Sequence, residues 1–148
     1  MRRVRCQAQL TVDAKGRLAL PKAIRAALVD AGSPPMVLAF QKGAIWAWTR
    51  DVFERTIEAP LAEADPFDED VMAFAHALLA NATDIEMDGQ GRIRLPAHLR
   101  DYAGIGKDVV VHSIVNHIEI WDKAAWDARY QEALHQHRGM SGMPRGQG

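Results

Sequence analysis

Two Asp–Arg pairs occur at the same spacing within a phrase that the sequence carries twice. Asp13 precedes Arg17 by four residues in DAKGRLALPKAIR, and Asp88 precedes Arg92 by four residues in DGQGRIRLPAHLR, 75 positions later. A carboxylate close to an arginine can hold the guanidinium in one orientation through a charge-assisted hydrogen bond. A guanidinium held in this way presents a planar fork of donors, which suits phosphate oxygens or the O6 and N7 atoms of guanine. The spacing therefore predicts recognition of an anion or a base.

Turn geometry explains part of the phrase without any ligand. Aspartate accepts hydrogen bonds from nearby backbone N–H groups, and Gly16 and Gly91 can adopt the positive φ that a short turn needs. On this alternative interpretation, the aspartates and glycines only form a turn. A turn does not require an arginine facing outward at its exit, however, so we interpret Arg17 and Arg92 as candidate binding residues.

The residues after each turn alternate between apolar and other side chains, which predicts strands with one buried face. The apolar positions expected to face inward are Leu18, Leu20, Ile93 and Leu95. Arg17, Arg92 and Arg94 then face outward. Lys15 adds a positive charge to the first turn, whereas Gln90 stands at the matching place in the second, where Arg94 can compensate.

Charge is distributed unevenly along the 148 residues, although the net charge is only −1. Seven Lys and Arg residues and one Asp occur in positions 1–25, whereas positions 56–91 hold nine carboxylates and no Lys or Arg. Basic residues return at Arg92, Arg94 and Arg100. Positive charge thus gathers around both copies of the phrase, which indicates an anionic partner there. The alternative is an ordinary solvated surface, because the chain as a whole is not basic.

The motifs of enzymes, metal sites and cofactor sites are missing or incomplete. Cys6 is the only cysteine, which excludes an internal disulfide and a cysteine-based zinc site. The segment 84–89, DIEMDG, resembles the start of a calcium loop, but Leu95 stands where the bidentate acid is needed. Ser113 follows His112 without the glycines of a nucleophile elbow. We therefore expect no catalytic residues, no metal, no cofactor and no small-molecule substrate.

No apolar run reaches the roughly 20 residues that a membrane-spanning helix needs. The basic start, MRRVRCQAQL, leads into no hydrophobic signal core. We expect a cytoplasmic protein that does not contact membranes.

The repeat extends beyond the phrase and defines two units. Trp48 matches Trp121 and Phe53 matches Trp126, now 73 positions apart. Because a unit of about 45 residues is too small to bury its own apolar face, the two units should pack on each other as a pseudo-dimer. Leu20 and Leu95 should then lie in one shared core.

Each unit shows the same order of elements. Alternation before and after the Asp–Gly turn is hairpin patterning, so the segments around 10–12 and 18–20 are predicted as paired strands. Short helices should follow Pro21 and Pro96 and end near glycines, and two β-rich runs should close each unit around the turns QKG and VNH.

Further helices are predicted outside these strands. One begins after Thr49 as a candidate N-cap. A second begins at Pro66 with an apolar stripe that includes Phe67, Val71 and Leu78. A third carries Trp126, Tyr130 and Leu134, and the Gly-rich tail after it is predicted to be disordered.

These features together resemble the MraZ family of bacterial transcriptional regulators, within the AbrB-like swapped-hairpin superfamily. The resemblance covers roughly residues 5–130 and is carried by DAKGRLALP, DGQGRIRLP, the Trp48 and Trp121 segments and the two-unit layout. It implies an α+β fold in which two tandem AbrB-like swapped-hairpin units form a pseudo-dimeric barrel with peripheral helices. The expected divisions are unit 1 over 7–52, linking helices over 53–80, unit 2 over 81–124, a C-terminal helix over 125–138 and a flexible tail over 139–148.

The resemblance also implies a function. Members bind repeated promoter boxes ahead of the division and cell wall gene cluster, and their subunits assemble into rings. The expected partners are therefore double-stranded promoter DNA and further copies of the chain, at the nucleoid. The expected DNA-binding residues are Asp13, Lys15, Arg17, Asp88, Arg92 and Arg94, with Gly16 and Gly91 forming the turns. The linking helix departs from the family, because it is acidic where basic residues are expected.

A different class of function remains open at this stage. An AbrB-like protein-interaction module, of the antitoxin or scaffold type, would use apolar surfaces to bind a protein partner. Salt dependence of DNA binding distinguishes the two, because contacts to phosphate release counterions.

Overall fold

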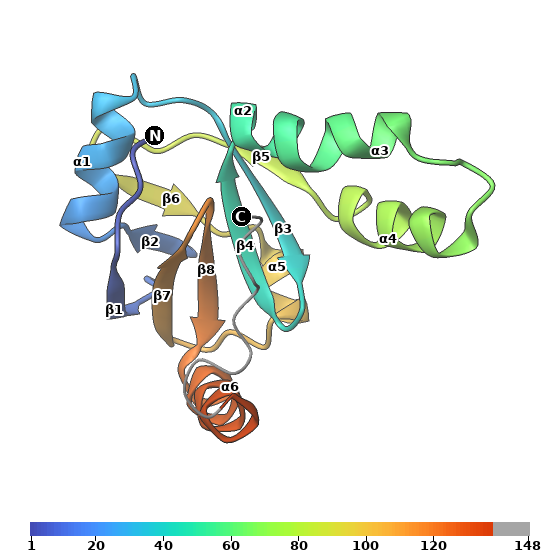
Figure 1. The fold of residues 1–148 in the computed structure, drawn as a ribbon. Helices are drawn as coiled ribbons and strands as arrows, with labels where there is room; N and C mark the ends of the chain where they lie inside the picture. Colours follow the sequence, from blue (N-terminus) through green and yellow to red (C-terminus); the bar gives the residue numbers. More distant parts are fainter. Residues whose placement is uncertain (138–148) are drawn as a thin grey trace.

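The computed structural model describes residues 1–137 and shows an α+β protein with an antiparallel sheet (Figure 1). Each unit contributes four strands and one short helix, and further helices follow each unit. The elements of the first unit are β1 (Gln7–Thr11), β2 (Arg17–Ala19), α1 (Lys22–Asp30), β3 (Met36–Gln41) and β4 (Ala44–Thr49). The elements of the second are β5 (Thr83–Ile85), β6 (Arg92–Arg94), α5 (Ala97–Tyr102), β7 (Asp108–Ile114) and β8 (His117–Asp122).

The strand order shows the duplication directly. The larger sheet runs β1-β7-β8-β4-β3-β5, and the smaller sheet pairs β2 with β6. Exchanging each strand for its counterpart in the other unit leaves both orders unchanged. Each unit's first strand pairs with the third strand of the other unit, since β1 pairs with β7 and β5 pairs with β3. The two units therefore cannot be separated without breaking both sheets.

The predicted pairing within each hairpin is wrong, although the turns themselves are where the sequence placed them. The strands on either side of the Asp13 turn do not pair with each other, because β1 pairs with β7 and β2 pairs with β6. Alternation shows which face of a strand is buried but does not identify its partner. The larger sheet ends at β1 and β5, so within residues 1–137 its strands do not close into a barrel.

One core lies under both repeats, as predicted. Leu20 and Leu95 belong to the same buried cluster, and Leu18 and Ile93 lie in it as well. The cluster is completed by apolar side chains of α1, α5 and the larger sheet, among them Ile24, Leu99, Ile45 and Ile120. Since both units supply its members, the core is formed only when the two units meet.

Helix ends and hairpin turns in each unit follow the sequence signals. Gly32 and Gly104 have φ of +88° and +62° just after α1 and α5, as expected for residues that end a helix. The runs around QKG form β3 and β4, and those around VNH form β7 and β8.

Two antiparallel helical segments link the units and extend away from the sheets (Figure 1). The first comprises α2 (Arg50–Phe53), a π-helical turn η1 (Glu54–Glu58) and α3 (Ala59–Glu63), and the second is α4 (Glu69–Leu79). Pro60 cannot donate the backbone hydrogen bond that an α-helix would send to Thr56, which accounts for the widened turn. Thr49 stands at the N-cap position of α2 as predicted, but its side chain makes no capping bond.

The predicted start of the second linking helix is corrected by the structure. Asp68, not Pro66, caps α4, and its carboxylate accepts hydrogen bonds from the backbone N–H groups of Asp70 and Val71. Phe67 therefore precedes the helix and is 91% exposed, so it does not belong to the apolar stripe. Leu78 is buried as predicted.

The last described helix is α6 (Lys123–Gln136), which is capped by Asp122 and packs against β7 and β8. Trp126 contacts Trp121, with ring centroids 5.9 Å apart, whereas Tyr130 and Leu134 are about half exposed. The tail over 139–148 lies outside the described residues.

Candidate nucleic-acid interface

The first Asp–Arg turn is closed by the aspartate itself. The Asp13 Oδ1 atom accepts hydrogen bonds from the backbone N–H groups of Lys15 and Arg17, both at 2.9 Å. The Asp13 Oδ2 atom accepts one from Arg17 Nε at 2.8 Å. Backbone bonds from Asp13 N–H to the Arg17 carbonyl and from Gly16 N–H to the Asp13 carbonyl complete the turn. One carboxylate thus forms the turn and holds the guanidinium, and within residues 1–137 no hydrogen bond or ion pair engages the two Nη groups of Arg17.

The second turn has the same geometry. Asp88 Oδ1 accepts from the backbone N–H groups of Gln90 and Arg92 at 2.9 Å, and Asp88 Oδ2 accepts from Arg92 Nε at 2.8 Å. The arginine side chains are equally exposed in the two copies, at 28%. Replacing Lys15 by Gln90 therefore changes the charge of the turn without changing its shape, because only the backbone of that residue joins the network.

Both aspartates have a pKa below its ordinary value. In each turn the largest cause is the hydrogen bond from the arginine backbone N–H, and the guanidinium lowers the pKa further. The carboxylates are therefore ionised at neutral pH. Because the pKa is lower in the folded chain, the contribution of these bonds to stability is present above the unfolded pKa and is lost as pH falls through the folded one.

The pairing of β2 with β6 brings the arginines of both copies onto one ribbon. Arg17 lies opposite Arg94, and Arg92 lies opposite Ala19. Residues directly opposite each other in an antiparallel pair share a face, so the three arginines lie on one side. The central pair, Leu18 and Ile93, is buried on the other side. The outward face of this ribbon therefore carries three guanidinium groups.

The pairing of Arg17 with Arg94 is unfavourable for the protein alone. Like charges directly opposite each other destabilise a sheet. Asp13 offsets the charge of Arg17, whereas no ion pair joins Arg94 to a carboxylate among residues 1–137. An anion bound over the ribbon would remove this repulsion, and a two-stranded ribbon fits the major groove of B-DNA, which is about 12 Å wide.

Backbone hydrogen bonds fix the two turns relative to each other. Leu20 N–H donates to the Gly91 carbonyl at 3.0 Å, and Leu95 N–H donates to the Gly16 carbonyl at 2.8 Å. Each glycine is buried and has φ near +79°. The two Asp–Arg turns therefore form one unit of structure, contributed by both copies of the repeat.

Arg25 and Arg100 lie against the turn of the opposite copy. A Cβ atom at Gly91 would come within 2.1 Å of Arg25 Cδ, and one at Gly16 would lie 3.1 Å from Arg100 Cζ. Arg100 Nε also donates to the Leu95 carbonyl at 3.1 Å. Neither arginine is among the site residues predicted from the sequence. Their signal was present, since both close the repeated phrase at the same position.

Changing Gly91 to alanine is expected to destabilise the protein by about 1–3 kcal/mol, because a side chain there requires an unfavourable φ and displaces Arg25. Gly89 is the matched control, because it lies in the same turn with open space at its Cβ position. Urea unfolding of Gly91→Ala and Gly89→Ala measures the difference. Equal stability of the two variants would show that the turn does not depend on Gly91.

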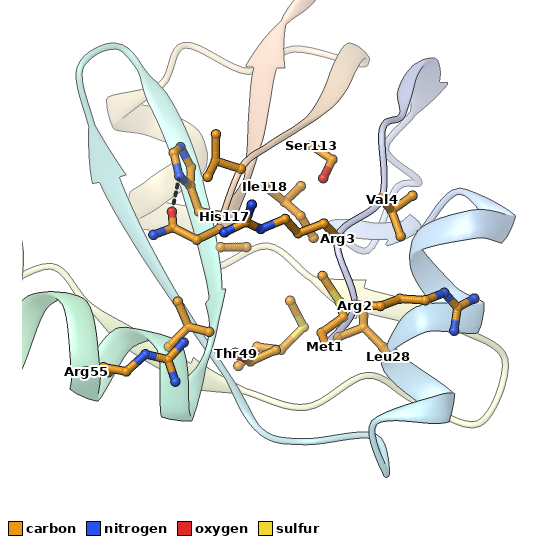
Figure 2. A pocket seen from close by; sticks show the side chains of 15 residues that line it. Met1, Arg2, Arg3, Val4, Leu28, Thr49, Arg55, Ser113, His117 and Ile118 are labelled. Atoms are coloured by element: carbon orange, nitrogen blue, oxygen red, sulfur yellow. Dashed lines mark hydrogen bonds between the residues drawn. The ribbon is translucent and has the colours of Figure 1, made fainter. Parts of the chain in front are cut away.

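A separate cavity of about 120 Å³ lies at the other end of β7, far along the strand from the Asp13 turn (Figure 2). Ser113 and His117 both line it. His117 Nε2 bonds to Glu119 at 2.8 Å and its Nδ1 lies 3.3 Å from Asn116 Oδ1, as the dashed line in Figure 2 shows. Both ring nitrogens are therefore engaged, and neither is available to activate Ser113 as a nucleophile.

Glu119 has a structural explanation. Burial alone would raise its pKa, but hydrogen bonds from His117 and from Trp121 Nε1, at 2.8 Å each, lower the pKa below its ordinary value. His117 also stacks on Trp46 with ring centroids 3.7 Å apart. The carboxylate therefore holds the packing of aromatic rings in place.

Residues 1–137 contain no group of three or more His, Cys, Asp or Glu side chains placed to hold a metal ion. No helix in this part of the chain is both long and apolar enough to cross a membrane.

Comparison with known proteins places the chain among bacterial regulators. A family model described as "MraZ protein, putative antitoxin-like" matches residues 78–139. A protein named "Transcriptional regulator MraZ" from Thioalkalivibrio sulfidiphilus is 38% identical over 120 residues, which cover 80% of this chain and 79% of the relative. Proteins of the same name from Acetivibrio thermocellus and Legionella pneumophila (strain Corby) are 35% and 33% identical, covering 81% and 91% of this chain and 81% and 90% of theirs.

Proposed function

The chain belongs to the MraZ family, and from that premise we propose that it is a transcriptional regulator whose two Asp–Arg turns together bind promoter DNA. The observation that carries the proposal is the ribbon of β2 and β6, which presents guanidinium groups from both copies in one fixed geometry. The proposed DNA-binding residues are Asp13, Lys15, Arg17, Asp88, Arg92 and Arg94, with Gly16 and Gly91 forming the turns.

The residues have different roles in this proposal. Arg17 and Arg92 are oriented by aspartates, so they suit contacts that require a fixed fork, such as the edge of guanine. No aspartate among residues 1–137 holds the side chain of Lys15 or Arg94 in this way, so both suit phosphate oxygens, which position the protein on the duplex. Asp13 and Asp88 act through the arginines that they hold.

We also propose that the two units, over 7–52 and 81–124, form the swapped-hairpin pseudo-dimer of the superfamily. The reciprocal pairing of β1 with β7 and of β5 with β3 supports this arrangement, because each unit completes the sheet of the other. The segment 53–80 then links the units, and 125–138 adds a helix beside the second.

Assembly supplies affinity in the proposed mechanism. One subunit contributes a single ribbon with three arginines, which gives weak binding at cellular salt. Several subunits in a ring, meeting repeated boxes ahead of the division and cell wall gene cluster, would raise the effective concentration of each further contact. DNA binding of this kind would place the protein at the nucleoid.

The spacing between boxes should therefore control affinity. Inserting about 5 base pairs, half a helical turn, between two boxes moves one box to the far side of the duplex. We expect most of the gain from multivalency to be lost, whereas inserting about 10 base pairs restores the facing and much of the affinity. Gel-shift titrations of these promoter variants measure the effect. Equal affinity for all spacings, or for one isolated box, would show that subunits bind independently.

The second candidate function is binding to a protein partner, because the description of the matched family includes the term antitoxin-like. We rank it second because such a module would use apolar surfaces, whereas the ribbon of β2 and β6 presents three arginines on its outward face. The relatives are named as regulators of transcription, and the non-enzymatic function proposed here agrees with those names.

A further inference from the structure

An aromatic groove of about 380 Å³ lies between α6 and strands β4, β7 and β8 of the larger sheet. Trp121, Trp126 and Tyr130 form its apolar wall, with successive ring centroids 5.9 and 5.7 Å apart. Lys42 and Arg129 stand at its rim and are exposed. Glu119, the one carboxylate among the described residues that line the groove, is already engaged by His117 and Trp121. The groove therefore combines an apolar wall with a positively charged rim.

The first unit shows which kind of side chain packs on the face of the sheet that corresponds to this groove. By the repeat spacing, Trp121 and Trp126 correspond to Trp48 and Phe53. In the first unit, Trp48 and Phe53 belong to a buried apolar cluster that also contains Leu78 of α4. Helix α4 therefore covers that aromatic pair. The second unit has no equivalent of α4 within residues 1–137, so the matching face remains open as a groove. An apolar side chain from elsewhere would complete it in the same way.

The loop before α4 displays a suitable side chain. Phe67 is 91% exposed, which is the largest exposure among the exposed large hydrophobic residues of the described chain. Its backbone is held, because Phe67 N–H donates to Asp65 Oδ1 and Asp68 N–H donates to the Asp65 carbonyl. Asp65, Asp68, Glu69 and Asp70 surround it with negative charge. The loop is thus a fixed aromatic tip in an acidic setting, which lowers the entropy cost of docking.

We propose that Phe67 of one chain inserts into the aromatic groove of a second copy. The acidic residues around Phe67 match the Lys42 and Arg129 rim, and the groove has room for a phenyl ring. Within one chain the tip cannot reach the groove, since Figure 1 places the α3–α4 loop at the far edge of the molecule and α6 at its base. The tip and the groove are different surfaces, so each chain can use both at once.

A contact of this kind is heterologous, and its repetition produces either a closed ring or an open filament. The inference rests on the assembly in the proposed function and names the surfaces that would perform it. It also gives the acidic linking segment a role, because its charge would be needed at the rim of the neighbouring groove.

Two surface variants test the contact. Phe67→Ser removes the tip, and Lys42→Glu with Arg129→Glu reverses the charge of the rim without touching the core. Val115→Asn is the matched control, because Val115 is an exposed apolar residue, at 69%, that belongs to neither surface. Sedimentation equilibrium gives the mass of each protein, and circular dichroism confirms that each is folded.

We expect the wild type and Val115→Asn to form assemblies, and the tip and rim variants each to sediment at the chain mass of 16.4 kDa. Mixing the two variants should produce a species of twice that mass, because the intact tip of one chain fits the intact groove of the other. A mixture that stays monomeric would overturn the contact, as would a wild-type mass for both variants.

The remaining outcomes separate this inference from the proposed function. A wild type that is itself monomeric would overturn the proposed assembly together with the contact. A wild-type assembly that persists in both variants would overturn the contact alone. Loss of assembly only when residues 138–148 are deleted would assign the groove to that segment and also contradict the proposal.

Discussion

Changing Arg17 and Arg92 together to alanine is expected to remove most of the affinity for promoter DNA. Each oriented guanidinium that reads a base contributes about 1–3 kcal/mol, so losing two costs about 2–6 kcal/mol for each ribbon. Where an arginine contacts phosphate instead, the slope of log affinity against log salt should fall by about one unit. Fluorescence anisotropy over a range of salt concentrations measures both effects.

The fold should survive this change, because both side chains lie on the outward face of the ribbon and solvent screens their ion pairs with the aspartates. Arg55→Ala is the control, since the Arg55 side chain is 68% exposed in η1 and belongs neither to the ribbon nor to the aromatic groove. Unchanged DNA affinity in a folded Arg17→Ala, Arg92→Ala protein would remove the ribbon from the DNA interface.

The largest expected effect on stability comes from Leu20 and Leu95. Both side chains are buried in the core that the two units share. Leu20→Ala or Leu95→Ala should each lower the free energy of unfolding by about 2–5 kcal/mol, through lost burial and the cavity left behind. Leu134→Ala should change it by less than about 0.5 kcal/mol, because Leu134 is half exposed.

The shared core also predicts a single unfolding transition, measured by both calorimetry and circular dichroism. The strands of each unit pair with those of the other, so neither unit has a complete sheet alone. Two separate transitions, or a folded fragment over residues 1–55, would be incompatible with one core.

The sequence was sufficient to predict the elements that repeat. The spacing of 75 residues gave both Asp–Arg turns, and alternation gave the buried faces of Leu18, Leu20, Ile93 and Leu95. These predictions depend on local chemistry, namely the hydrogen bonds of an aspartate turn and the two-residue period of a strand. They are correct because nothing distant in the chain alters them.

Strand partners could not be predicted in the same way. Leu10 and Leu18 lie on strands joined by a short turn, which suggests that the strands pair locally. Each strand instead pairs with the other unit, and the register that brings Arg17 opposite Arg94 follows from that exchange. Partner choice depends on the packing of both units, which alternation within one segment does not reveal.

The start of α4 and the position of Phe67 were missed for a related reason. Pro66 and Asp68 are both good signals for a helix start, and the start predicted from the sequence was Pro66. The structure uses the carboxylate of Asp68, which moves Phe67 out of the helix and into solvent. Moving the start of the helix by two residues thus changes Phe67 from a predicted core residue to an exposed residue that can contact another chain.

Hydroxyl-radical footprinting on the DNA upstream of this protein's own gene tests the central claim most directly. We expect protection of short boxes that repeat at regular spacing on one side of the duplex. The Arg17→Ala, Arg92→Ala protein should leave the same boxes unprotected at equal concentration. Protection spread evenly along the DNA, or regular protection that persists in the double variant, would contradict the assignment of the paired Asp–Arg turns as the promoter-reading element.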